Sequence, residues 1–229
     1  MAINNKKIYI ISLLITIVLF LSLLLLRDSF GNAREGAITA RVQETYNNLN
    51  EMQMFMLMSE IYGDEMACLA SKEKLKKLDK SLWDLGIKID QYRVASEEFM
   101  KDPFYLEQKK VFNDNEIFYM MLLGRLNKHC DNKQEVVSFF YQNSKDCKKC
   151  DDQSFVLTDI KKDAKDDLSI FSYDADLNLT SINLLTQYYG INEFPCIIIK
   201  EKKYCGMQDK DFIVKKICND NEISICDEN

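Results

Sequence analysis

The chain has 229 residues, of which 47% are apolar and 29% are charged, so it is long and apolar enough to form a folded domain with further segments. Its formal charge is −6, and its 30 Lys and Arg residues are dispersed among 36 Asp and Glu residues, which argues against a general nucleic-acid-binding protein. A single histidine, His129, nearly excludes Ser-His-Asp catalysis and histidine-based metal sites. The eight cysteines therefore carry the candidate chemistry.

Residues 8–26 form an uninterrupted run of 19 residues without a charge. At about 1.5 Å per residue, such a helix crosses the roughly 30 Å hydrocarbon layer of a membrane, and we predict an anchor within an N-terminal segment of residues 1–34. A cleaved signal peptide ending near Gly31-Asn32-Ala33 is the alternative, but its apolar core typically spans only about 7–15 residues, which favours an uncleaved signal-anchor.

The orientation of the anchor is not fixed by charge, because lysines precede the apolar run and arginines follow it. The number of cysteines is more informative, since thiols pair into disulfides in an oxidising compartment. We therefore expect a single-pass membrane protein whose C-terminal domain lies outside the cytoplasm.

Residues 35–131 have a helical pattern and form the predicted juxtamembrane region. Apolar or small residues recur every three or four positions and predict an amphipathic or short coiled-coil seam, at Ile38, Val42, Thr45, Leu49, Met52 and Met56. A second helix is expected over 72–95, and a third opens at Pro103, because a proline costs nothing in the first helical turn. This region either covers the candidate active face or dimerises through the seam.

The pattern changes after residue 131. Short β-branched and aromatic runs predict strands at 136–141, 168–173 and 196–200, and the returning arm of a hairpin at 203–207. Helical segments are expected at 150–164, 180–189 and 209–218. Strands separated by helices favour parallel pairing, and the hairpin adds an antiparallel strand. The predicted fold class is α/β, with a sheet flanked by helices over residues 132–218 and a tail over 219–229.

The sequence Cys147-Lys148-Lys149-Cys150 stands between the first strand and the following helix. Unpaired backbone N–H groups and the positive end of the helix dipole stabilise a thiolate at such a position, and the two lysines add positive charge. A thiolate is the species that attacks a disulfide. Half of a zinc site is the other interpretation of a C-x-x-C motif, but no second C-x-x-C is present to complete it.

Residues 134–218 resemble the thioredoxin-like family. The resemblance rests on the apolar strand 136–141, the C-K-K-C at the helix start, and the segment 189–195, which is similar to the family's approach to its cis-proline. It implies that Cys147 is the attacking thiol and Cys150 the resolving thiol. It also implies that Pro195 is cis and faces them, that Phe194 lies on the substrate side, and that the reaction needs neither cofactor nor metal.

The remaining cysteines leave several pairings open. Cys68 and Cys130 flank the helical region, and a disulfide between them would clamp it; two buried free thiols are the alternative. Near the C-terminus the plausible bonds are Cys205–Cys218 or Cys218–Cys226. Cys196 follows Pro195 directly and is a candidate auxiliary thiol, with a buried strand cysteine as the alternative.

The sequence thus predicts a membrane-anchored thiol–disulfide oxidoreductase that acts on cysteine-containing client proteins outside the cytoplasm. An oxidase or isomerase role is favoured over a reductase role, because a stabilised thiolate makes the pair more oxidising. A membrane or soluble redox partner is expected, and no nucleic acid. The alternative is a redox-inactive interaction or scaffold module of the same fold, tethered to the membrane.

Overall fold

The computed structural model describes residues 5–95, 101–130, 132, 134–143, 145–219 and 223–226. The chain divides into two compact units, residues 1–41 and 42–229. Helix α1 (Asn5–Tyr62) begins in the first unit and ends in the second. Within the described residues, Tyr9–Leu26 is the one helical segment long and apolar enough to cross a membrane, with a mean hydropathy of 2.9 and no residue buried. This segment coincides with the predicted apolar run.

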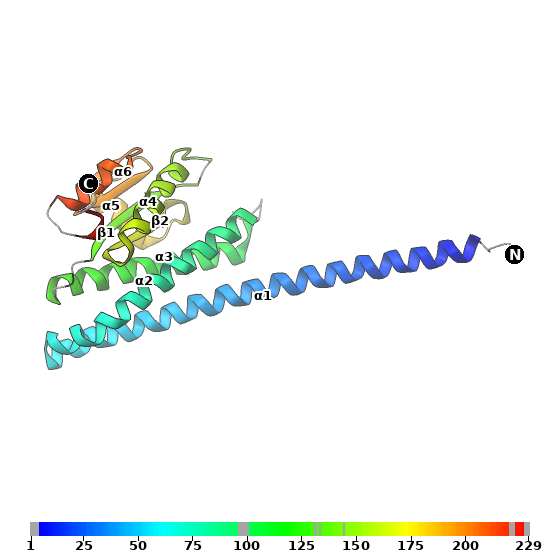
Figure 1. Cartoon of the computed structure of the whole chain (residues 1–229), viewed down its shortest axis with the longest axis horizontal. Helices are drawn as coiled ribbons and strands as arrows, with labels where there is room; N and C mark the ends of the chain where they lie inside the picture. The colour runs from blue at the N-terminus through cyan, green and yellow to red at the C-terminus, as the bar shows by residue number, and fades with distance from the viewer. Residues whose placement is uncertain are drawn as a thin grey trace. The chain divides into compact units, whose positions relative to one another are not determined.

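Helices α2 (Asp64–Ala95) and α3 (Pro103–His129) run side by side in the second unit (Figure 1). Residues 42–56 of α1 belong to the same unit, and the predicted seam is buried there at Val42, Thr45, Leu49, Met52 and Met56. The Thr45 hydroxyl lies 3.3 Å from that of Ser81 on α2, and Lys74 of α2 pairs with Glu51. The seam is therefore used for packing within the chain.

The start of α3 is built as the sequence predicts. Asp102 is its N-cap, and the Asp102 carboxylate accepts hydrogen bonds from the backbone N–H groups of Phe104 and Tyr105. Pro103 occupies the first turn. A disulfide joins Cys68, in the first turns of α2, to Cys130, which follows α3. The predicted Cys68–Cys130 disulfide is thus confirmed, and the alternative of two buried free thiols is wrong.

The sheet has four strands in the order β2-β1-β3-β4. They are β1 (Glu135–Tyr141), β2 (Leu168–Asp174), β3 (Cys196–Ile199) and β4 (Lys202–Cys205). β1 and β2 pair in parallel, whereas β3 is antiparallel to both β1 and β4. The parallel direction expected for the third strand is wrong. The chain after α5 (Thr180–Tyr189) enters β3 at the edge where β1 ends, since Cys196 pairs with Phe140.

Helices cover both faces of the sheet (Figure 1). On one face, α4 (Cys150–Ala164) and α6 (Lys210–Cys218) enclose a buried core with the inward side chains of β1 and β3. On the other face, α3 contributes Tyr119, whose ring packs edge-on against Phe171 of β2. The predicted bounds of α4 and α5 agree with the structure. The domain boundaries expected near residues 34, 131 and 218 remain predictions.

The outer edge of β2 is occupied by side chains of α3. Asn113 donates its Nδ2 to the Ser172 carbonyl oxygen at 3.2 Å and accepts the Asp174 N–H at 3.0 Å. Glu116 accepts the Ser172 N–H at 3.0 Å. These side chains take the places that a neighbouring strand would occupy, so α3 and the sheet form one packed body.

Candidate functional site at the Cys147–Cys150 disulfide

Cys147 and Cys150 form a disulfide at the start of α4, with their Cα atoms 5.4 Å apart. Both residues are buried, Cys147 with 5% and Cys150 with 2% of the surface exposed. The Cys150 N–H donates to the Cys147 carbonyl oxygen at 3.2 Å, and α4 begins at Cys150. The structure therefore brings the two predicted site cysteines together at the predicted place between β1 and α4.

The loop from β1 to the disulfide is fixed by Asn143. Asp176 Oδ2 accepts the Asn143 N–H at 2.7 Å and the Asn143 Nδ2 at 2.6 Å. The Asn143 carbonyl oxygen in turn accepts the Cys147 N–H at 2.9 Å. Sequence reasoning missed this pair, because Asp176 is distant in the chain and only the β1–β2 pairing brings it close.

Charges of both signs surround the disulfide. Lys148 and Lys149 are exposed, and no side chain caps the first turn of α4, so its backbone N–H groups and two ammonium groups favour a thiolate. Asp151 and Asp152, in the same first turn, oppose that effect. The sequence prediction considered the lysines alone, and the two carboxylates reduce the expected stabilisation of a Cys147 thiolate.

Pro195 lies at the edge of the sheet from which the loop to Cys147 departs. Cys196 pairs with Phe140, so Pro195 precedes β3 at the end of β1. The Phe194–Pro195 peptide bond is cis, as the sequence led us to expect, Pro195 is buried, and Phe194 is half-buried. The substrate-side role of Phe194 remains a prediction.

Hydrogen bonds of Gln153 and Gly206 connect the segment at Pro195 to α4. The Gln153 side chain, buried in the first turns of α4, accepts the Gln208 N–H at 2.7 Å and donates to the Gln208 carbonyl oxygen at 3.2 Å. Two residues earlier, the Gly206 N–H donates to the Pro195 carbonyl oxygen at 2.8 Å. The segment at Pro195 is therefore linked, through residues 206–208, to the first turns of α4, where the disulfide lies.

Cys196 is not a free thiol, because it forms a disulfide with Cys205. The two residues are paired across β3 and β4, and their Cα atoms are 3.9 Å apart. The hydrogen bond from Gly206 to Pro195 marks Cys196 and Cys205 as a non-hydrogen-bonded pair, where opposing side chains approach most closely. The predictions of an auxiliary thiol at Cys196 and of a Cys205–Cys218 disulfide are therefore wrong. Cys218 instead pairs with Cys226.

A cavity of about 450 Å³ lies between α2, α3, α4 and the sheet, and Cys150 forms part of its wall. Its lining includes several aromatic residues, among them Trp83, Tyr105, Phe112, Tyr141 and Phe155. Sequence analysis missed this cavity, because its walls come from several separate segments spread over residues 79–174.

Two buried carboxyl groups line the same cavity. Burial raises the pKa of Glu116 to about 8, although its hydrogen bonds from Ser172 and Asn113 act in the opposite direction. Burial also raises the pKa of Asp174. Burial raises the pKa of the Tyr141 hydroxyl as well, and the ammonium of Lys109 lies over the Tyr141 ring. The sequence did not identify any of these groups as neighbours of Cys150.

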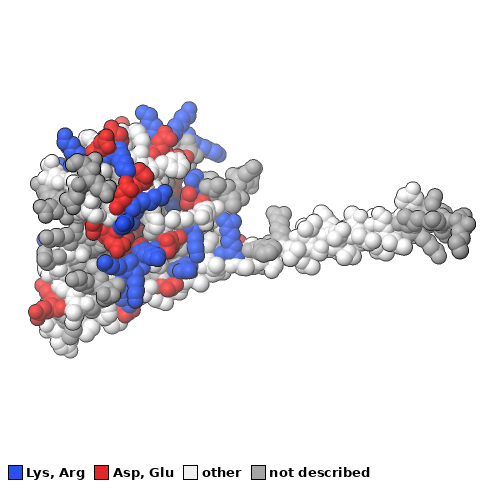
Figure 2. All heavy atoms as spheres, in the orientation of Figure 1, with Lys and Arg blue, Asp and Glu red and all other residues white. Residues whose placement is uncertain are grey.

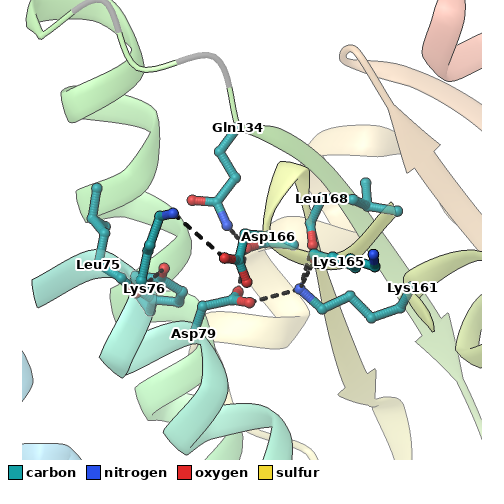
Figure 3. Close-up of polar contacts among 10 residues, drawn as sticks. Leu75, Lys76, Asp79, Gln134, Lys161, Lys165, Asp166 and Leu168 are labelled. Atoms are coloured by element: carbon teal, nitrogen blue, oxygen red, sulfur yellow. Dashed lines mark hydrogen bonds and ion pairs between the residues drawn. The ribbon is translucent and has the colours of Figure 1, made fainter. Parts of the chain in front are cut away.

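An ion pair between Lys161 and Asp79 contributes to the lining of the cavity, and Figure 3 shows its polar contacts. Lys161 of α4 donates to Asp79 Oδ2 of α2 at 2.6 Å and to the backbone carbonyl oxygens of Lys165 and Leu168. The Ser169 hydroxyl donates to Asp79 Oδ1 at 2.5 Å. Figure 3 shows these groups meeting between α2 and the start of β2, so the network fixes α2 against α4 and the sheet.

Lys and Arg side chains alternate with Asp and Glu over the visible face of the second unit, and part of α1 carries neither (Figure 2). Among the described residues, no group of three or more His, Cys, Asp or Glu side chains is arranged to hold a metal ion. Comparisons with protein-family models, with curated proteins and with solved structures find no match.

Proposed function

We propose that the chain is a membrane-anchored thiol–disulfide oxidoreductase with a thioredoxin-like domain. The observation that carries the proposal is the disulfide between Cys147 and Cys150, closed over three residues where β1 gives way to α4. The mixed four-stranded sheet with helices on both faces and the position of Pro195 beside the end of β1 support the same assignment.

Cys147 is the thiol that reacts with clients, and Cys150 is the resolving thiol. Of the two, Cys147 is the more exposed, and Cys150 faces the internal cavity. The exposed Lys148 and Lys149 lie between them and attract a client thiolate toward the disulfide.

In the oxidising direction, a client thiolate attacks the Cys147 sulfur, breaks the Cys147–Cys150 bond and expels the Cys150 thiolate. A second client thiolate attacks the client sulfur of this mixed disulfide and expels the Cys147 thiolate. The client loses two electrons and gains a disulfide, whereas the pair gains two electrons and, on protonation, two protons. A membrane or soluble redox partner restores the disulfide, and the reverse sequence reduces a client.

The anchor and the compartment belong to the same proposal. Tyr9–Leu26 spans the membrane once, and the rest of the chain after it lies outside the cytoplasm, where disulfides persist. Because all eight cysteines are paired, an impermeant maleimide should label intact cells only after an impermeant reductant is added. Labelling that requires cell lysis would contradict this orientation.

The activity is tested with the full chain in detergent and a peptide that contains two reduced cysteines. We expect the wild-type chain to form the peptide disulfide at least tenfold faster than Cys147→Ser, because the serine variant has no disulfide at this site. Cys150→Ser should accumulate a mixed disulfide at Cys147 with an oxidised peptide, detected by mass spectrometry.

The matched control is Cys218→Ser with Cys226→Ser, which removes another local disulfide of the domain, one with a sequence separation of 8. This variant should retain the wild-type rate. If Cys147→Ser also retains it, the proposed mechanism is wrong, and the redox-inactive module expected as the alternative is the better description.

A further inference from the structure

We propose that the cavity beside Cys150 binds a segment of the client polypeptide that presents an apolar side chain and a basic residue close to its reacting cysteine. The inference rests on the proposed exchange reaction and adds the class of client. It concerns the pocket formed by α2, α3 and α4, which lies outside the predicted thioredoxin-like segment on two of its three sides.

The size and lining of the cavity fit a side chain. Its volume of about 450 Å³ falls within the range of binding pockets, about 300–1,000 Å³. Gly86 of α2 allows the Phe112 ring to pack closely against this helix, since a Cβ atom there would lie 3.1 Å from the tip of that ring. Cys150 is in the wall, so a bound segment lies next to the exchanging disulfide.

Exposed apolar side chains stand on two sides of the cavity. Phe155 of α4 is 74% exposed, and Ile87 of α2 is 43% exposed, although both line the cavity. Trp83, one helical turn before Ile87, is half-buried on the same wall. An incoming apolar side chain would cover these groups, which explains their position better than isolated exposure does.

The charges in the cavity favour a basic neighbour. Two of the three cations that line it are already paired, Lys161 with Asp79 and Arg93 with Asp90. The ammonium of Lys109 acts on the carboxyl groups of Glu116 and Asp174, and the guanidinium of Arg93 acts on Asp151 as well as on Asp90. Five acidic residues line the cavity against three basic ones, so an added arginine or lysine is attracted.

The same charge argument selects a client over a second copy of this chain. The chain carries a formal charge of −6, and two copies therefore repel one another. A basic client segment gains from that charge instead.

Binding can be measured without exchange, because Trp83 is the single tryptophan of the chain and lines the cavity. The probe is a nine-residue Gly/Ser peptide with a central alanine in place of the client cysteine, one Phe before it and one Arg after it. Added to the full chain in detergent, it should change the Trp83 emission saturably. Its dissociation constant should be at least tenfold lower than those of peptides with Phe→Ser or Arg→Glu.

Two variants of the chain locate the site. Phe155→Ser and, separately, Ile87→Ser should each weaken binding of the Phe/Arg peptide at least fivefold. The matched control is Tyr188→Ser, an exposed aromatic residue on α5 that contributes nothing to the cavity, and its dissociation constant should stay within twofold of wild type.

The outcomes separate this inference from the proposed function. No saturable change in emission, or equal affinity for the three peptides, overturns the client pocket. A change that depends on chain concentration without peptide identifies a second copy as the occupant and also overturns it. Failure of the full chain to oxidise a dithiol peptide overturns the exchange reaction alone, because the alanine peptide cannot react.

Discussion

Glu116 is a buried carboxyl group that links α3 to β2. Its side chain is 4% exposed, accepts the Ser172 N–H of β2 and the Asn113 amide, and has a pKa raised to about 8 by burial. An unfolded chain would protonate this group only near pH 4.5. The folded chain therefore holds one more proton than the unfolded chain between about pH 4.5 and pH 8.

This difference fixes the sign of a pH dependence. The stabilisation from protonated Glu116 is fully present below about pH 4.5 and is lost as the pH rises through about 8. In urea unfolding of the full chain, Glu116→Gln should reduce the fall of unfolding free energy by up to about 1.4 kcal/mol per pH unit within this window. Glu107→Gln, an exposed change on the same helix, should leave the wild-type slope. Identical slopes for Glu116→Gln and wild type would show that the carboxyl is not held protonated.

Some cysteine pairings could have been predicted from local sequence, whereas the surroundings of Cys150 could not. The two-residue turn Lys200-Glu201, with both φ angles positive, places Cys196 opposite Cys205. Reading that turn from the sequence would have identified the pair, because strand register follows from turn length. The position of Cys150 in a cavity wall had no such local signal.

The starts of helices were predictable where a capping residue stands next to them in the sequence. Asp102-Pro103 starts α3, and Asp209 caps α6 by accepting the Phe212 N–H at 2.8 Å. The direction of β3 was not predictable, because the run Cys196–Ile199 is buried on both faces and has no directional pattern. The way α2 and α3 attach to the sheet depends on the contacts of Asp79 with Lys161 and Ser169 and on α3 packing, none of which leaves a periodic signal.

The Asp79–Lys161 ion pair should carry a large part of the attachment of α2. Asp79→Ala leaves the Lys161 ammonium buried without its carboxylate, and we expect a loss of about 3–5 kcal/mol of unfolding free energy in urea. The double change Asp79→Ala with Lys161→Met should recover part of this loss, because no uncompensated charge remains. The control is Asp159→Ala, a change on the same helix α4 as Lys161. It breaks an exposed ion pair with Lys210 of α6 and should change stability far less. Equal effects of Asp79→Ala and Asp159→Ala would contradict a buried, energetically coupled pair.

At the scale of the whole molecule, the candidate site combines segments that the sequence treats as separate. The C-K-K-C motif and the proline loop come from the predicted sheet domain, but the cavity walls of α2 and α3 come from the helical region. Sequence patterns identified the two cysteines that pair at the start of α4, since a C-x-x-C motif is local. They could not identify the pocket, because packing between distant helices determines it.

The Cys68–Cys130 disulfide closes 62 residues of that helical region. By loop-closure entropy it should contribute about 4 kcal/mol, against about 2.5 kcal/mol for Cys218–Cys226, which closes 8 residues. We therefore expect the double serine variant of the first pair to lower the midpoint of urea unfolding more than that of the second. A larger fall in the midpoint for the Cys218–Cys226 variant would show that the stability of the helical region does not depend on the Cys68–Cys130 disulfide.

The hydrogen bonds from α3 to β2 have a consequence for self-association. Open sheet edges are where foreign chains add a strand and start polymers. At the edge of β2, Asn113 and Glu116 bind the backbone N–H and carbonyl of Ser172 and the N–H of Asp174, and β4, the strand at the opposite edge, exposes Lys202 and Lys203 to solvent. A second chain that approaches either edge strand therefore meets backbone groups that are already hydrogen-bonded or two adjacent lysines, and strand addition is disfavoured at both edges.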